Sequence, residues 1–112
     1  GRYVALECRS VHSGNAVSVA ELYLTGKDGK RLSREQWSVK YADSENASGN
    51  HTGDKAFDLQ ESTFWQTVGG TDFPHLLVID LGAEQEITGI EYLPRAEQGA
   101  PESVRTAAVY VY

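Results

Sequence analysis

The sequence predicts an all-β protein, folded as an antiparallel sandwich or barrel, and three observations lead to this class. About seven short apolar segments are separated by turn residues at regular spacing, as in antiparallel sheets. Most of these segments alternate apolar and polar residues, which buries one face of each strand. Helical periodicity is absent beyond a single turn at residues 33–36, which Ser33 could cap.

The individual strands follow from their local patterns. Residues 3–7 alternate, with Val4 and Leu6 on one side, and the strand at 17–25 ends at Gly26. The Asp28-Gly29 turn that follows is the usual signal of a hairpin. Residues 76–81 are nearly all apolar, which predicts a buried central strand. Further strands are expected at 37–41, 87–93 and 104–112. Two packed sheets would bury these residues: Leu76, Val78, Ile79, Leu81, Ile87, Ile90, Trp37 and Trp65.

Composition narrows the function classes. The chain of 112 residues suffices for one domain with a core of its own, and Cys8 is its single cysteine, so no internal disulfide is expected. The net charge of -6 argues against nucleic acid and against an anionic membrane surface. No apolar run approaches the length of a membrane span. No signal peptide is visible, and the start at Gly1 suggests a piece of a longer chain.

Catalytic signatures are missing from the sequence. We find no nucleophile elbow, no zinc-protease helix motif and no cysteine–histidine signature. The 16 Asp and Glu residues always include some pairs, so pairing alone does not indicate glycosidase chemistry. The sequence therefore predicts a non-catalytic domain.

Residues 55–65 form a polar turn between two apolar anchors. Asp58 offers a carboxylate, Thr63 a hydroxyl and a carbonyl, and Phe64 and Trp65 fix the turn to the core. Calcium prefers six to eight such oxygens at one point. The alternative is an Asx- or Ser/Thr-turn without a metal, and the EF-hand spacing is absent.

Several motifs together resemble a known family. The pieces that carry the resemblance are residues 56–58 with 62–65, residues 74–76 with 79–82 (Ile-Asp-Leu-Gly), and residues 88–89 with 92–95 (Tyr-Leu-Pro-Arg). They resemble the discoidin-like domains, also called coagulation factor type C domains. This family includes the family 32 carbohydrate-binding modules of bacterial glycoside hydrolases. The resemblance implies a β-sandwich of the discoidin-like jelly-roll type, with residues 1–112 as a single domain of a longer chain.

The order of the segments differs from the usual order in that family. Residues 2–4 and 19–22 resemble its closing strands but come first, whereas residues 37 and 42–45 resemble its opening strand and first loop. This order is expected of a circular permutation, which is tolerated where the termini lie side by side. A hairpin that usually follows the last strand is missing. The chain is therefore either a compact variant or a fragment whose parent supplies that piece.

The resemblance also implies a structural calcium ion in the 55–65 turn. Its oxygens would come from the carboxylates of Asp58 and Glu21, the hydroxyl of Thr63, and the carbonyls of Ala20, Lys55, Gln60 and Thr63. The alternative for Glu21 is a solvated residue at the end of a strand. Leu59 and Gln60 stand where the family usually has Gly and an acidic residue or Asn.

Sugar-binding relatives hold a monosaccharide between loops at one end of the sandwich. By resemblance the corresponding residues are Glu45, Gln66, Phe73 and Arg95. Arg95 would offer a planar donor fork to adjacent hydroxyls, the alternative being a surface ion pair with Glu97 or Glu91. Glu45 would accept from a hydroxyl or only solubilise its loop. Gln66 replaces the usual His and the usual Trp platform is absent, so Phe73 is either a substitute platform or a core residue.

The function implied is a non-catalytic carbohydrate-binding module that directs an attached glycoside hydrolase to glycans of galactose or amino-sugar type. The expected partners are a glycan and the catalytic domain of the parent chain, without nucleic acid or membrane insertion. The expected location is secreted, periplasmic or on the cell surface. The alternative is a protein-binding adhesion module or a structural spacer without sugar binding.

Overall fold

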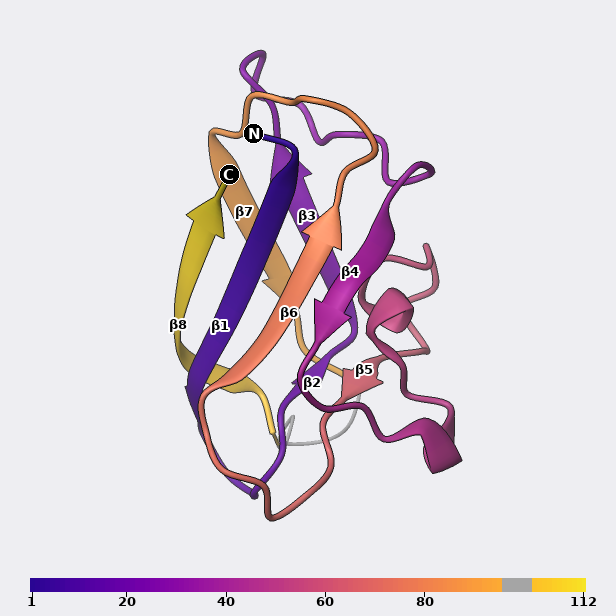
Figure 1. Ribbon diagram of the computed structural model, residues 1–112, viewed down its shortest axis with the longest axis vertical. Coiled ribbons are helices and arrows are strands. Elements are labelled where there is room, and N and C mark those ends of the chain that lie inside the picture. The colour runs from indigo at the N-terminus through magenta and orange to yellow at the C-terminus, as the bar shows by residue number, and fades with distance from the viewer. Residues whose placement is uncertain (96–101) are drawn as a thin grey trace.

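The computed structural model describes residues 1–95 and 102–112, and strands dominate this part of the chain (Figure 1). The elements are β1 Tyr3–Val11, β2 Ser18–Val19, β3 Glu21–Thr25, β4 Ser38–Ala42, η1 Ala47–Gly49, η2 Gly53–Ala56, β5 Trp65–Gln66, β6 His75–Asp80, β7 Gly89–Leu93 and β8 Val104–Val111. The all-β prediction is confirmed. The single turn of helix expected at 33–36 does not form, and the two short 3-10 helices lie in segments expected to be loop and turn.

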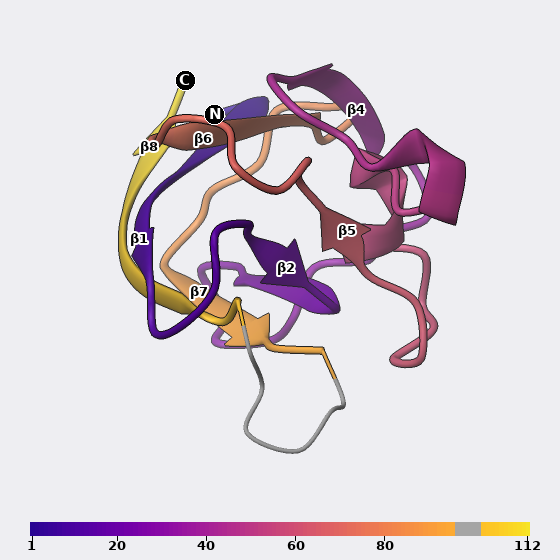
Figure 2. The same ribbon diagram turned by 90° about the horizontal axis from the view of Figure 1, so that it is seen from below.

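The strands form antiparallel sheets that enclose one core. A four-stranded sheet has the order β4-β6-β1-β8, and β3–β7 and β2–β5 form two-stranded sheets. Figure 2, seen from the loop end, shows the large sheet curving around the smaller pairs. The first strand of the chain, β1, lies between β6 and β8. The termini lie side by side at the other end of the sandwich (Figure 1), where the Arg2 N–H donates to the Tyr112 carbonyl at 2.6 Å. A permuted order requires such adjacent ends.

The strand expected at 17–25 divides at Ala20 into two strands with different partners. β2 pairs with β5, and β3 pairs with β7. The Asp28-Gly29 turn forms, with the Gly26 N–H donating to the Lys30 carbonyl at 2.8 Å. It closes only one isolated bridge, between Thr25 and Arg31. The predicted turn therefore closes a short antiparallel reversal, in which the Leu32 N–H also donates to the Leu24 carbonyl at 2.8 Å. In the part of the chain that the structure describes, no second strand follows it directly, and the strand partner of β3 is β7, on the other edge of β3.

The core follows the alternation of the strands. Val4 and Leu6 of β1, expected on one side of the strand, are buried together with Cys8, and both tryptophans are buried. Ala5, on the other side of β1, is buried as well. β6 alternates as well: Leu77 and Ile79 are buried, so the apolar run does not bury both faces. The predicted core positions Leu76, Val78 and Ile87 are half-buried, and Ile90 is exposed.

Cys8 is expected to resist thiol reagents in the native protein. Burial, aided by the charges of Asp43 and Glu7, raises the pKa of its thiol to about 12. At pH 8 the thiolate fraction is then roughly a thousandfold smaller than that of an ordinary thiol. Iodoacetamide labelling at pH 8, with and without guanidinium, checks this. Equally fast labelling in both conditions would contradict the buried thiol.

Candidate functional site

The turn at 57–63 brings several predicted oxygen donors together. The carboxylate of Asp58 accepts the Gln60 N–H at 3.1 Å and the hydroxyl hydrogen of Thr63. The Thr63 hydroxyl also lies 3.1 Å from the Gln60 carbonyl oxygen. Both ends of the turn are anchored. η2 and the buried Phe57 lie at its start, and the buried Trp65 follows its end.

Glu21, at the start of β3, is the buried acid of this region. Its side chain is 1% exposed, and Oε1 lies 3.0 Å from Nη1 of Arg34. Among the described residues, Oε2 has no hydrogen-bond partner although it is buried. Burial raises the pKa of Glu21 against the opposing effect of Arg34, and the charges of Asp58 and Glu61 raise it further. The alternative of a solvated strand-end residue is therefore wrong.

These residues fit a hard cation. A buried carboxylate oxygen without a partner is costly, and a cation near Asp58 would satisfy it. In the described part of the chain, no three His, Cys, Asp or Glu side chains converge on one point. A calcium ion would therefore need the main-chain carbonyls expected of Ala20, Lys55 and Gln60, and also Thr63. The Lys55 N–H donates to the Thr52 carbonyl at 3.0 Å and so helps to fix η2, whose residue Lys55 carries one of these expected carbonyls.

Arg95, which follows β7, and Gln66 of β5 are brought together at the loop end by a shared partner, Glu102. Nη1 of Arg95 lies 3.2 Å from Oε1 of Glu102, and the side chain of Arg95 is 14% exposed. The same oxygen accepts Nε2 of Gln66 at 2.9 Å and the hydroxyl hydrogen of Ser18 at 2.7 Å. Beside them, the Arg95 guanidinium lies 5.3 Å from the ring centre of Phe64.

The ion-pair partner of Arg95 in the structure is Glu102, which the sequence alone does not predict. Glu91 instead pairs with Arg31 at 2.7 Å, and Glu97 lies outside the described residues. Glu102 is the partner that sequence reasoning missed. It lies close to Gln66 only in the folded chain, so no local pattern points to it.

The other two predicted ligand residues make different contacts. Oε2 of Glu45 accepts the Gly53 N–H at 2.5 Å and so holds the start of η2. Its neighbour Asn46 donates from Nδ2 to Oε1 of Gln66 at 2.8 Å, which connects this loop to the cluster. Phe73 packs edge-on against the buried His75, with ring centres 4.8 Å apart, and lies against the core. The structure thus brings Gln66 and Arg95 together, whereas Glu45 and Phe73 face other partners.

Comparison with known proteins decides the family. A family model described as F5/8 type C domain matches residues 40–112. The chain belongs to this discoidin-like family. Two galactose oxidases from Gibberella zeae, one of them from strain PH-1, are 34% identical to it over 73 residues. The match covers 62% of this chain and 10% of each relative, so the chain spans about a tenth of their length.

The family assignment carries a general functional class. Discoidin-like domains are generally non-catalytic modules, often bind carbohydrate or protein, and are typically extracellular or secreted. The matched region contains Asp58, Gln66 and Arg95, whereas Ala20 and Glu21 precede it. None of the helices in the described ranges is long and apolar enough to cross a membrane.

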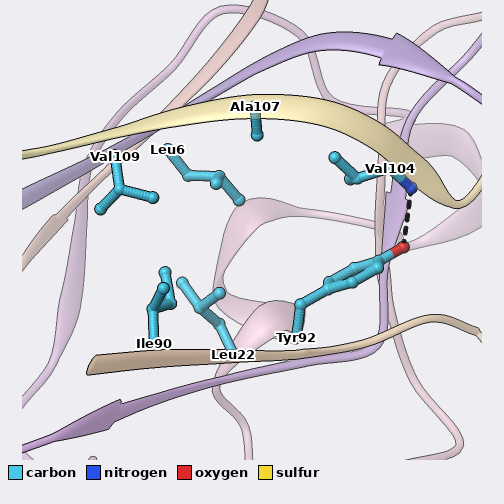
Figure 3. A pocket seen from close by; sticks show the side chains of 7 residues that line it. All are labelled: Leu6, Leu22, Ile90, Tyr92, Val104, Ala107 and Val109. Atoms are coloured by element: carbon cyan, nitrogen blue, oxygen red, sulfur yellow. Dashed lines mark hydrogen bonds between the residues drawn. The ribbon is translucent and has the colours of Figure 1, made fainter.

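The F5/8 type C domain also has an apolar cavity of about 160 Å³ between β7 and β8 (Figure 3). Its lining residues are Leu6, Leu22, Ile90, Tyr92, Val104, Ala107 and Val109. At one end the Tyr92 hydroxyl accepts the Val104 N–H at 3.1 Å (Figure 3) and donates to the Ser18 carbonyl at 2.9 Å. Ile90 is 37% and Val109 39% exposed, although both point toward the cavity. In the described topology β8 is an edge strand, so no strand covers these side chains.

Replacing Leu59 with glycine is expected to stabilise the domain. Leu59 has a φ of 68° and its side chain is 59% exposed, so it strains the backbone and buries little. Relief of the left-handed conformation is worth about 1–2 kcal/mol, partly offset by the flexibility of glycine in the unfolded chain. The net gain should raise Tm by about 2–4 °C. Thermal melts of Leu59→Gly and of the control Leu59→Ala, which keeps the strain, check this. A glycine variant that melts below the alanine variant would contradict it.

Proposed function

We propose that this F5/8 type C domain is a non-catalytic carbohydrate-binding module that directs an attached glycoside hydrolase or other glycan-active enzyme to its substrate. The observation that carries the proposal is Arg95, fixed by Glu102 beside Gln66 and Phe64 at the loop end. The proposed ligand is a terminal galactose or amino sugar, a choice supported by the galactose oxidases to which the chain is similar. We place the protein outside the cytoplasm, as secreted, periplasmic or cell-surface.

The chemistry of the cluster suits a sugar. A guanidinium presents a planar set of donors that can bind two adjacent hydroxyls. Its pairing with Glu102 limits the rotamers of Arg95 before the ligand arrives, which lowers the entropy cost of binding. Gln66 adds an amide, and Asn46 behind it fixes the orientation of that amide. Weak affinity for one sugar suffices in an attached module, because attachment raises the effective concentration of the enzyme at its glycan.

Calcium has a structural role in this proposal. The ion would be held by Glu21, Asp58, Thr63 and the carbonyls of Ala20, Lys55 and Gln60. It would neutralise the buried carboxylate of Glu21 and the half-buried one of Asp58, and join the start of β3 to the 57–63 turn. The single structural observation that supports it is the buried oxygen of Glu21 that lacks a hydrogen-bond partner among the described residues.

A glycan array probed with the calcium-loaded domain tests the ligand. We expect reproducible binding to terminal galactosides or amino sugars. A blank array with well-folded protein would overturn the carbohydrate proposal.

A protein-binding adhesion function is the second candidate, and the open cavity between β7 and β8 favours it. Core-facing side chains such as Ile90 and Val109 are exposed there, and exposed apolar patches mark contact sites. Ile90→Asp should abolish such binding and leave glycan binding intact. A structural spacer would bind neither kind of partner.

A further inference from the structure

The guanidinium of Arg34 forms an ion pair with the buried carboxylate of Glu21. The side chain of Arg34 is 11% exposed, and its Nη1 lies 3.0 Å from Oε1 of Glu21 and 3.4 Å from the Leu22 carbonyl oxygen. The guanidinium stacks on Tyr23, 4.4 Å from the ring centre. These contacts come from β3 alone, so they fix Arg34 against the strand that begins with Glu21.

We propose that Arg34 is a built-in counter-cation of the metal site, which stabilises Glu21 in the metal-free domain and weakens its affinity for calcium. The inference rests on the calcium proposed above and is independent of the glycan ligand.

The two carboxylate oxygens of Glu21 have different surroundings, one paired with Arg34 and the other open to a cation. Asp58 and Glu61 act on Glu21 through their negative charges, and Arg34 opposes them. Arg34 contacts Oε1 only, and Oε2 has no hydrogen-bond partner in the described residues. A cation bound at Oε2 would therefore lie a few ångströms from the guanidinium, on the same carboxylate. Like charges at such a distance in a poorly solvated site repel strongly. Arg34 must therefore lower the affinity for the ion, although it is needed when the ion is absent.

The segment that carries Arg34 is also attached to the metal turn. Trp37 packs edge-on against Phe57, with ring centres 5.9 Å apart. An open surface depression lies between these parts, and Arg34, Trp37 and Asp58 are among its lining residues. Arg34 and the Asp58 carboxylate therefore border the same solvent-accessible surface.

Neutralising Arg34 tests the proposal. We would titrate the parent, Arg34→Met and Arg34→Lys with calcium by calorimetry, and with terbium by luminescence sensitised through Trp37. Melting in calcium and in chelator would accompany both titrations. We expect Arg34→Met to bind calcium about tenfold more tightly, or more, and to melt earlier than the parent in chelator. Arg34→Lys keeps the charge and should bind within about twofold of the parent.

Each outcome decides the proposal. Equal or weaker calcium binding by Arg34→Met overturns it. If the parent binds no calcium, the metal proposal fails for the natural protein. Calcium binding by Arg34→Met in that case supports the role of Arg34 as counter-cation. If Arg34→Met also binds no calcium, the counter-cation proposal is overturned too. Should Arg34→Met unfold in chelator, Arg34→Gln replaces it in the titration. Calcium must then refold Arg34→Met, and failure to refold contradicts the inference.

Discussion

An Arg95→Ala variant is expected to lose glycan binding and to keep its fold. The guanidinium is the cation of the loop-end cluster, and charged hydrogen bonds contribute about 1.5–3 kcal/mol each. The loss of two such bonds lowers affinity by at least about a hundredfold. A weak single-sugar interaction then falls below detection. The cluster survives, because Glu102 still accepts from Ser18 and Gln66.

The same glycan array, with calorimetry on the best ligand, measures this effect. Arg2→Ala is the matched control: Arg2 pairs with Asp80 at 3.0 Å at the opposite end of the sandwich and should bind normally. Arg95→Ala should still fold, because Glu102 keeps its hydrogen bonds from Ser18 and Gln66, although the loss of a largely buried ion pair lowers Tm. Unchanged glycan binding by a folded Arg95→Ala protein would show that the sugar site lies elsewhere.

Asp58→Ala is expected to remove the calcium dependence of the melting temperature. A ligand at a hundred times its Kd stabilises the folded state by about 2.7 kcal/mol, which corresponds to roughly 10 °C in a domain of this size. Without the Asp58 carboxylate the proposed site loses one of its two charged ligands. The hydrogen bonds from Gln60 and Thr63 that hold the turn are lost as well. The variant should therefore melt below the parent in calcium, and its Tm should be the same in calcium and in chelator.

Scanning calorimetry of both proteins in calcium and in chelator gives the four temperatures required. Asp54→Ala serves as the control, because the side chain of Asp54 is 53% exposed, pairs with Lys55 at 3.7 Å and lies outside the predicted donor set. It should retain the calcium effect. An Asp58→Ala protein that melts at the same temperature as the parent in both buffers would contradict the metal proposal.

Local patterns in the sequence were sufficient for the fold class. Alternation along β1 predicts which side of the strand is buried, because successive side chains point to opposite faces. The motifs at 79–82 and 92–95 indicate the discoidin-like family, which the match over residues 40–112 confirms. The donor residues of the 55–65 turn are also visible, since Asp58 and Thr63 are close in the sequence. These features depend on neighbours within a few positions.

Strand partners and ion pairs between distant segments of the chain could be seen only in the tertiary structure. The strand partner of β3 is the distant β7, and Ile90 is exposed because no described strand covers it. Glu102 meets Gln66, and Arg34 meets Glu21, only after the chain has folded. Periodicity reports which face of a strand is apolar, but it carries no information about the partner strand. The sequence by itself therefore determined the fold class, most of the strands and the family. Long-range packing decided the ionic partners of Arg95 and Glu21, because side chains far apart in sequence meet only when the sheets close around the core.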